Sequence, residues 1–452
     1  MDDFTMTFSE HRYLAPGATE INTILTVRAG LSAPAGPPGE PEPVGLAEVI
    51  VVDASGSMTI RDKMANARRA TVAAIAMLPE GARFAIVAGD TEARMVYPRE
   101  AGLAVAGSRT RRDARAAIRA TQPSGGTRIG VWLGLARQLL ADWPDDVRHV
   151  TLLTDGQNQE PPNVLNRALA DCRDVFQCDA RGIGADWNAD ELIAIAEALR
   201  GQARAITATT DLAADFRTVV GAWRAKAVRD LTLRIELSRF ARLRHFRQVH
   251  PTKTDLDAFT RPAGELAVTV ATGAWAAGEL REYELGVDVG RAGELNTDMR
   301  AGRVDAFVGG RRRADPAVVL LRRTEGGALS LPLDDKSRRY SLEAQMSRAL
   351  GDGCAAYLRK ESGQAERDVG RAVAIAHEAG DQDMLDRIAR VAEIDDPVTG
   401  RVRLRPDVPD EWWLELAVDK TYSRQSRTDR RCVCGYTSAP GARACEECGR
   451  PL

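Results

Sequence analysis

The chain of 452 residues lacks the features of several protein classes. No stretch approaches the ~18 apolar residues that suggest a membrane-spanning helix. The N-terminal sequence MDDFTMTFSEHRYL contains no apolar core of signal-peptide length. The formal net charge is only −2, so no strong overall field favours binding to nucleic acid or to a membrane surface. We therefore expect a cytoplasmic protein.

Lysine and cysteine are also scarce. Only six of the 62 basic residues are lysine, and with abundant alanine and glycine this indicates a GC-rich genome, most simply a bacterial one. Of the seven cysteines, three are scattered and four lie close to the end of the chain. An odd number of cysteines in this arrangement argues against a disulfide framework.

Motifs for common enzyme chemistry are missing from the sequence. There is no G-x-x-x-x-G-K-[ST] phosphate loop and no G-x-S-x-G nucleophile elbow. The segment GIGADW lacks the third glycine of the dinucleotide fingerprint and follows the fifth predicted strand rather than the first. His149 is interpreted as a satisfied neighbour of the sheet. We therefore predict no catalytic residues and no enzymatic activity.

The most informative pattern that is present is a set of oxygen-bearing side chains: Asp53, Ser55, Ser57, Thr127 and Asp155. The first three follow the apolar run VIVV, Asp155 follows the run VTLLT, and Thr127 lies in the glycine-rich string SGGTRIG. Buried parallel strands read as continuous apolar runs, and ligands bind at their carboxyl ends. Hydroxyl and carboxylate oxygens suit a hard cation such as Mg²⁺. Alternatively, the first string merely caps the next helix, but this does not explain the other two.

The order D-x-S-x-S, then T, then D resembles the metal-ion-dependent adhesion site of von Willebrand factor type A domains, over residues 44 to 222. The resemblance implies that Ser55, Ser57 and Thr127 bind Mg²⁺, or Mn²⁺ or Ca²⁺, directly. It implies that Asp53 and Asp155 act mostly through water or by orienting the ligands. An open coordination position would then bind an Asp or Glu carboxylate of a partner protein.

The hydrophobic pattern predicts a doubly wound α/β domain with a parallel sheet. Strands are expected at 48–53, 83–89, 93–97, 148–154 and 177–183. Helices are expected at 61–78, 110–121, 128–141, 161–175, 188–199 and 211–227. After residue 228 the period changes to two, which is typical of an antiparallel sandwich. Helical periodicity returns at 340–395, with helices at 341–360, 365–380 and 381–394 and a turn at Gly380.

The fold class expected for the whole chain is an α/β von Willebrand factor type A domain inserted in a β-sandwich, followed by helices and a zinc ribbon. The expected boundaries are 1–31 for N-terminal strands that complete the sandwich, 32–45 for a Pro/Gly linker, 46–227 for the α/β domain, 228–335 for the sandwich, 340–395 for a helical hairpin region, 396–430 for a linker, and 431–452 for the ribbon.

The four clustered cysteines are Cys432, Cys434, Cys445 and Cys448. Four thiolates satisfy tetrahedral Zn²⁺ and leave no open position, so the cluster predicts a structural site that resembles a small zinc ribbon. The first pair is separated by one residue, Val433, where a ribbon usually has two. Disulfides or free thiols are the alternative.

These features favour a non-enzymatic adaptor that binds proteins in a cation-dependent manner. The resemblance implies partners in multiprotein assemblies, such as an AAA+ ATPase or a phosphosignalling component. Two alternatives stay open. The zinc ribbon and the arginine-rich segment 401–431 would serve a nucleic-acid-binding protein, and Mg²⁺ could polarise a phosphate in a metal-dependent hydrolase.

Overall fold

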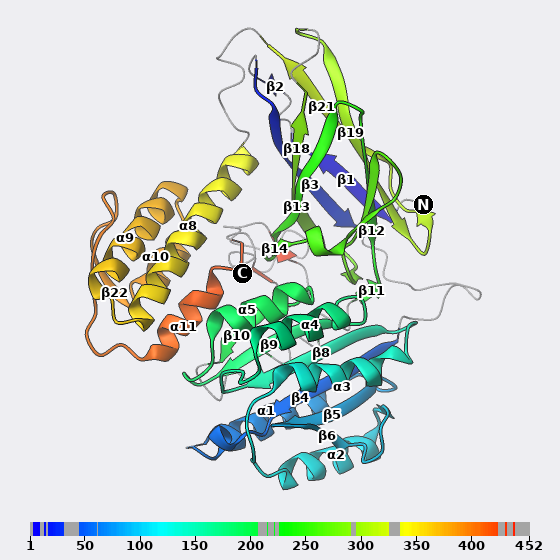
Figure 1. Cartoon of the computed structure of the whole chain (residues 1–452), viewed down its shortest axis with the longest axis vertical. Coiled ribbons are helices and arrows are strands. Elements are labelled where there is room, and N and C mark those ends of the chain that lie inside the picture. The colour runs from blue at the N-terminus through cyan, green and yellow to red at the C-terminus, as the bar shows by residue number, and fades with distance from the viewer. Residues whose placement is uncertain are drawn as a thin grey trace. The chain divides into compact units, whose positions relative to one another are not determined.

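The computed structural model of the chain describes residues 3–9, 13–14, 17–30, 45–60, 62–206, 215, 221, 226–290, 295–324, 335–423, 430–431 and 437–438. The chain divides into two compact units, both drawn in Figure 1. The α/β unit comprises residues 29–231 and 271–279. The second unit, called the β-α unit here, comprises residues 1–28, 232–270 and 280–452.

A mixed sheet forms the centre of the α/β unit, with the strand order β10-β9-β8-β4-β5-β6 and with β7 also paired to β5. Neighbours from β10 to β5 are parallel, whereas β6 and β7 run antiparallel to β5. The strands are β4 (Leu46–Asp53), β5 (Arg83–Gly89), β6 (Ala93–Tyr97), β7 (Ala104–Val105), β8 (Val147–Thr154), β9 (Gln177–Ile183) and β10 (Ala203–Ile206). Every residue of β4 is buried, as expected for a central strand that is covered on both faces.

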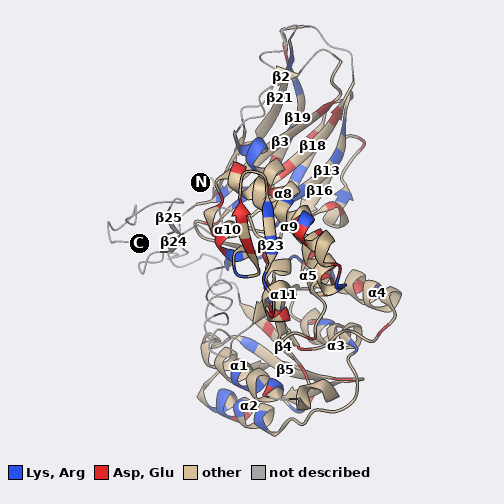
Figure 2. Ribbon diagram, turned by 90° about the vertical axis from the view of Figure 1, so that its left-hand side faces the viewer, with Lys and Arg blue, Asp and Glu red and all other residues tan. Residues whose placement is uncertain are grey.

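Helices cover both faces of this sheet (Figure 1). They are α1 (Lys63–Met77), α2 (Ser108–Ala120), α3 (Ile129–Ala141), α4 (Pro162–Cys172) and α5 (Ala189–Ala198). Ile75 of α1 and Ile118 of α2 share one apolar core with Ile50 and Phe84 of the sheet. On the other face α3 contacts β4 and β5, and α4 packs against α3. Figure 2 shows basic residues along α1 and α2, away from this core. The helix expected at 211–227 falls mostly outside the described residues.

Two sheets of the β-α unit combine strands from distant parts of the chain. Their orders are β1-β3-β18-β13-β14 and β15-β16-β12-β19-β21-β2, with β20 also paired to β19. Strand β3 pairs antiparallel with β18, and β2 pairs with β21. The first sheet contains β1 (Phe4–Phe8), β3 (Glu20–Ala29), β18 (Leu280–Val289), β13 (Ala241–His250) and β14 (Thr254–Asp255). The second contains β15 (Thr260–Pro262), β16 (Ala267–Ala271), β12 (Thr232–Leu237), β19 (Asp298–Val308), β21 (Ala317–Arg323), β2 (Tyr13–Leu14) and β20 (Arg311–Arg312).

A short ladder in the α/β unit joins β11 (Lys226–Val228) to β17 (Trp275–Ala276). Strand β11 lies in the segment 29–231. Strand β17 lies in the segment 271–279, which follows residues 232–270 of the β-α unit in the sequence. The α/β unit is therefore assembled from two separate segments of the chain.

The helical part of the β-α unit consists of α8 (Asp335–Leu358), α9 (Ser362–Ala379) and α10 (Gln382–Ile388). Gly380 ends α9 in the left-handed conformation, with φ of 64°, so the turn predicted at this glycine is confirmed. The helix expected to continue to Ile394 is wrong in its second half. It ends at Ile388, and β22 (Ala392–Asp396) begins four residues later. Ala392 in this strand and Val402 farther along the chain are both buried.

The linker expected at 396–430 is also wrong for residues 401–419. Strand β23 (Arg401–Leu404) pairs with β22, and α11 (Asp410–Asp419) follows. Trp413, Leu414 and Val418 of α11 are buried, and the acids Asp410 and Glu411 at its first turn suit the positive end of the helix dipole. Arginines interrupt the apolar pattern of β23, whereas α11 contains none.

Strands β24 (Arg430–Arg431) and β25 (Thr437–Ser438) form an antiparallel pair near the end of the chain. The four clustered cysteines, Cys432, Cys434, Cys445 and Cys448, lie outside the described residues. Within the described ranges, no helix combines the length and the apolar character needed to cross a membrane.

Candidate metal-binding site

The α/β unit brings the five oxygen-bearing residues to one edge of its sheet. Strand β4 ends at Asp53, and β8 ends at Thr154, one residue before Asp155. The two strands are parallel neighbours, with Val52 opposite Leu153, so their carboxyl ends lie side by side. A 3-10 turn, η1 (Gly56–Thr59), then holds Ser57 directly beyond β4.

Hydrogen bonds connect four of these side chains. Asp53 accepts the backbone N–H of Ser55 at 2.8 Å and the hydroxyl of Thr154 at 2.7 Å. The hydroxyls of Ser55 and Ser57 lie 3.0 Å apart, and Ser57 donates to Asp155 Oδ1 at 2.9 Å. The predicted residues therefore form one continuous cluster across the ends of β4 and β8.

Gly156 shows where Thr127 lies relative to this cluster. A Cβ atom placed on Gly156 would be 3.3 Å from Thr127 Oγ1, 3.6 Å from Ser57 Oγ and 3.9 Å from Asp53 Oδ2. Oxygens from the end of β4 and its following turn, and from the loop of Thr127, thus lie around one small space that a side chain at position 156 would fill. The donor set is hydroxyl and carboxylate oxygen alone, which fits Mg²⁺ and related hard cations.

The loop that carries Thr127 is fixed by backbone contacts. Gly125 adopts a left-handed conformation, with φ of 68°, and its carbonyl accepts the N–H of Gly56 at 2.9 Å. A Cβ on Gly125 would lie only 2.7 Å from Thr91 Oγ1, so glycine permits the close approach of this loop to Thr91. Ser124 donates to Asp90 at 2.9 Å.

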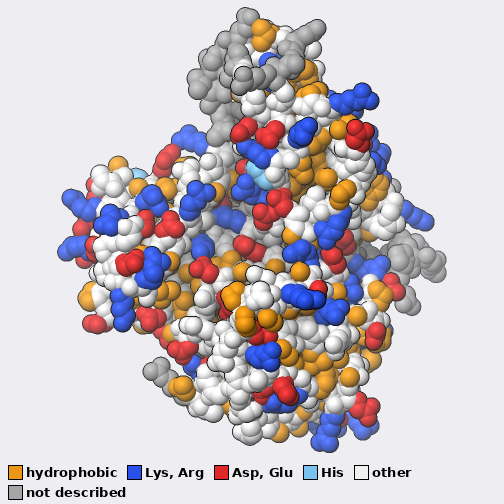
Figure 3. Space-filling model, in the orientation of Figure 1, with side chains coloured by type: hydrophobic (Ala, Val, Ile, Leu, Met, Phe, Trp, Pro, Cys, Tyr) orange, Lys and Arg blue, Asp and Glu red, His pale blue; other side chains and the backbone are white. Residues whose placement is uncertain are grey.

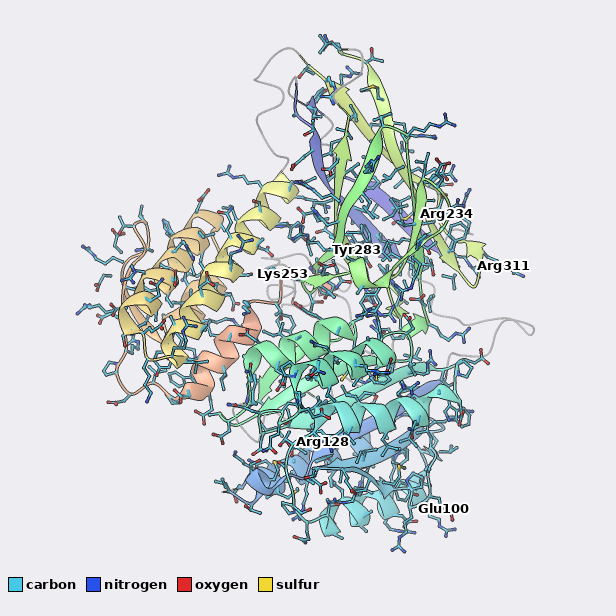
Figure 4. The ribbon with its side chains drawn as sticks, viewed as in Figure 1. Glu100, Arg128, Arg234, Lys253, Tyr283 and Arg311 are labelled. Atoms are coloured by element: carbon cyan, nitrogen blue, oxygen red, sulfur yellow. The ribbon has the colours of Figure 1, made fainter. Side chains whose placement is uncertain are left out.

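The start of α3, directly after Thr127, is held by the loop that follows Asp155. Glu160 Oε2 accepts the N–H of Gly130 at 2.6 Å, and Asn158 Oδ1 accepts the N–H of Ile129 at 3.1 Å. These bonds satisfy backbone donors that a helix N-terminus leaves free. Arg128, labelled in Figure 4, lies between Thr127 and these capped residues.

Lys63 and Asp186 belong to the same cluster, although the sequence pattern did not point to them. Lys63 is the first residue of α1, and its Nζ lies 2.6 Å from Asp155 Oδ2 and 2.5 Å from Asp186 Oδ2. Burial alone would lower the pKa of Lys63, but the hydrogen bonds to the two aspartates raise it above its ordinary value. Lys63 is thus held as a cation beside the candidate metal ligands.

Burial also raises the pKa of Asp53, and the nearby charge of Asp155 acts in the same direction. Hydrogen bonds from Ser55 and Thr154 offset this only in part. Asp53 and Asp155 are both 0% exposed. The cluster therefore concentrates buried negative charge at the ends of β4 and β8.

A second group of charged side chains is buried under the same sheet. His149 Nδ1 lies 2.6 Å from Glu48 Oε2, and its Nε2 lies 3.5 Å from Asp179 Oδ2. Arg181 lies 3.5 Å from the same Asp179 oxygen and 2.5 Å from Asp215. Although burial opposes the charged imidazole, the two neighbouring carboxylates raise the pKa of His149 to about 9. His149 is thus a satisfied neighbour within the sheet, as the sequence predicted.

Among the described residues, no group of three or more His, Cys, Asp or Glu side chains is arranged to hold a metal ion. The cluster at Gly156 differs from such sites because hydroxyl oxygens supply most of its candidate ligands.

Comparisons with known proteins match the two units separately. A family model described as von Willebrand factor type A domain matches residues 47–205, and one described as von Willebrand factor type A C-terminal domain matches residues 374–417. The second match spans β22, β23 and most of α11, which lie largely in the segment 396–430 that was predicted as a linker.

Solved structures are similar over nearly the whole chain. A von Willebrand factor type A protein from Catenulispora acidiphila is 33% identical with a TM-score of 0.85, covering 93% of this chain and 97% of that one. The ArnB paralog VWA2 from Sulfolobus acidocaldarius has a TM-score of 0.56 at 13% identity, covering 93% of this chain and 98% of that one, a likeness of fold alone. An uncharacterized protein of Synechocystis sp. is 29% identical over 216 residues, or 46% of this chain. This chain spans about half the length, 49%, of that curated relative.

Proposed function

The chain belongs to the von Willebrand factor type A family, and from this premise we propose that it is a non-enzymatic adaptor that binds proteins in a divalent-cation-dependent manner. Membership of the family points to a role in protein interaction in general. One observation carries the finer proposal. Oxygens of Thr127, Ser57 and Asp53 all lie within 4 Å of the same point beside Gly156.

Ser55, Ser57 and Thr127 would hold the cation, and Asp53 and Asp155 would balance its charge and orient the hydroxyls. Neutral hydroxyl ligands leave a divalent ion with residual positive charge. When bound, Mg²⁺, Mn²⁺ or Ca²⁺ supplies a coordination position for an Asp or Glu carboxylate of a partner protein. The raised pKa of Asp53 supports this proposal, because a bound cation would provide the positive charge that this buried carboxylate needs.

The surroundings of the site also support partner binding. Ile60 follows η1 directly, three residues after Ser57, and is 54% exposed. A large apolar side chain beside a charged centre gives a partner a contact that excludes water around the carboxylate. We expect the partner's acidic residue to be followed or preceded by an apolar one.

The rest of the chain would place the captured partner in a larger assembly. We propose that the two sheets of the β-α unit form a sandwich into which the α/β unit is inserted, as the pairing of β3 with β18 supports. We further propose a structural Zn²⁺ on Cys432, Cys434, Cys445 and Cys448, a cytoplasmic location in a bacterium, and an AAA+ ATPase or a phosphosignalling component as partner. Of the arginines offered for the nucleic-acid alternative, Arg403 pairs with Asp395 at 2.9 Å.

The experiment is affinity capture from the native cell in Mg²⁺ and in chelator, combined with Mg²⁺ calorimetry on the purified protein. Wild type should bind Mg²⁺ and retain a partner that the chelator releases. The Ser55→Ala/Ser57→Ala variant should lose both. Ser362→Ala, at the exposed start of α9, is the control and should behave as wild type. Recovery of the same partners from all variants in all conditions would refute the proposal.

A further inference from the structure

Lys63 occupies an unexpected position for a cation. It begins α1, where the helix dipole already places positive charge, and only 8% of it is exposed. The chain uses lysine at just six positions. The contacts with Asp155 at 2.6 Å and Asp186 at 2.5 Å offset the cost of placing a buried ammonium there.

We propose that Lys63 is an internal cation that weakens metal binding at this site and strengthens the binding of a carboxylate to the metal-loaded site. The proposal rests on the proposed function, because it concerns the same site. Its basis is the shared carboxylate. Asp155 receives the Ser57 hydroxyl on Oδ1 and the Lys63 ammonium on Oδ2.

Lys63 and a divalent ion would both lie beside the carboxylate of Asp155. Because both are positively charged and close together, they repel each other. Since Lys63 is almost fully buried, solvent and salt screen this repulsion only weakly. The same positive charge attracts an anion that approaches the metal. A partner carboxylate therefore meets two positive centres, while the metal alone meets one competing cation.

Asp186 moderates this effect from the solvent side. Its side chain is 66% exposed, and it pairs with the same ammonium. Removing the charge of Asp186 should leave Lys63 less neutralised. The changes Lys63→Met and Asp186→Asn should therefore act in opposite directions, which a loss of local structure would not produce.

The orientation of Asp155 does not depend on Lys63 alone. Asp155 follows the last residue of β8, is 0% exposed, and keeps its hydrogen bond with Ser57 at 2.9 Å. Its geometry should thus survive when methionine replaces the lysine at a similar length.

Calorimetry with Mg²⁺ alone is the first test. Lys63→Met should bind Mg²⁺ about tenfold more tightly than wild type, and Asp186→Asn should bind it a few fold more weakly, because Asp186 is exposed. Lys63→Arg keeps the charge and should remain close to wild type. Lys226→Met is the matched control, since Lys226 forms a comparable pair with Glu279 at 2.8 Å elsewhere in the α/β unit.

Acetate binding to the Mn²⁺-loaded protein is the second test, read from the fall in water-proton relaxation as acetate displaces bound water. Lys63→Met should bind acetate about tenfold more weakly, and Asp186→Asn more tightly. The role assigned to Lys63 would be overturned if Lys63→Met bound Mg²⁺ more weakly than wild type, or if Lys63→Met and Lys226→Met changed the affinities equally. Either result would leave the proposed function intact. No Mg²⁺ binding by wild type would overturn both.

Discussion

Gly156 limits the space at the candidate metal site. Its backbone follows Asp155, and the position of its absent side chain lies between Thr127, Ser57 and Asp53. The nearest of their oxygens, on Thr127, would be 3.3 Å from a Cβ, so alanine would fit with a shift of a few tenths of an ångström. Alanine would nevertheless occupy the space on which the oxygens converge.

Gly156→Ala should therefore weaken Mg²⁺ binding by about tenfold or more while costing less than about 1 kcal/mol of unfolding free energy. Calorimetry and urea unfolding measure the two quantities. Gly134→Ala is the control, because a Cβ at this position in α3 meets no atom within 4 Å. Unchanged Mg²⁺ affinity in Gly156→Ala would place the metal elsewhere.

His149 should make the stability of the α/β unit depend on pH. Its pKa is about 9 in the folded chain, above the value of about 6.5 expected in the unfolded chain. The contacts of the imidazolium with Glu48 and Asp179 therefore stabilise fully below pH 6.5, and this contribution is lost as pH rises through 9. We expect the loss to be about 3 kcal/mol.

Urea unfolding at pH 6, 7.5 and 9 measures this effect. His149→Gln should lower stability at pH 6 and remove most of the fall between pH 6.5 and 9. His377→Gln, at an exposed position near the end of α9, should leave the wild-type profile unchanged. A wild-type profile that is flat over this range would show that the imidazolium is not stabilised as the contacts indicate.

Local sequence pattern predicted some of these residues and could not predict others. Asp53 and Asp155 stand out because each follows an apolar run, and strands of that kind end at a common edge. Lys63 and Asp186 carry no such signal, since they meet only after β4, β8 and β9 are aligned. Their pairing is a consequence of tertiary structure and is visible only there.

At the scale of elements, two glycines allow the β22–β23 hairpin to contact α9. A Cβ on Gly370 would lie 2.1 Å from the carbonyl oxygen of Gly400, and a Cβ on Gly400 would lie 2.2 Å from that of Gly370. Gly400 also adopts a left-handed conformation, with φ of 70°. Neither backbone has room for a side chain between helix and turn.

Gly370→Ala should destabilise the β-α unit by about 2–4 kcal/mol, because the clash is with backbone rather than with a flexible side chain. Gly363→Ala tests the intrinsic effect of alanine in the same helix. Gly363 is exposed and meets only Arg367 at 3.7 Å, so this change should be neutral or stabilise by up to about 1 kcal/mol. Calorimetric unfolding compares the two, and equal stabilities would show that the hairpin does not pack on α9 as described.

Elements with a clear hydrophobic period were predicted to within a few residues, including the arginine-rich helix α2, whereas β22 and β23 were not predicted. Strand β5 was predicted with its observed bounds, because its apolar residues form one continuous run. Strand β13 carries a weaker signal, since its sequence ARLRHFRQVH alternates only weakly. Arg247 of this strand pairs with Glu284 at 3.0 Å. Because such charged residues interrupt the apolar alternation, the sequence of the strand resembles that of a loop.

At the scale of the whole molecule, charge gives little indication of function. Figure 3 shows acidic and basic side chains interleaved on the visible face, as a net charge of −2 among 28% charged residues would predict. The order of hydrophobic patterns along the sequence was more informative about the domain boundaries. The α/β domain expected at 46–227 lies within the segment 29–231 of the α/β unit, whereas the return of residues 271–279 to that unit had no signal in the sequence.

The two proposed metal sites should act independently, because they use different ligand chemistry and ligands from distant parts of the sequence. Hydroxyl and carboxylate oxygens of the α/β unit suit Mg²⁺, while the thiolates of Cys445 and Cys448 suit Zn²⁺. Cys445→Ser/Cys448→Ser should therefore lose one equivalent of Zn²⁺, measured by elemental analysis, with unchanged Mg²⁺ affinity.

Glu446→Gln/Glu447→Gln, which alters the two residues between these cysteines, should retain the Zn²⁺ and serves as the control. If the cysteine variant keeps its zinc, the thiolate site is not as proposed. If it loses zinc and also Mg²⁺ affinity, the two sites are coupled. Partner capture by a zinc-free variant that still binds Mg²⁺ would then show that partner recognition does not require the zinc site.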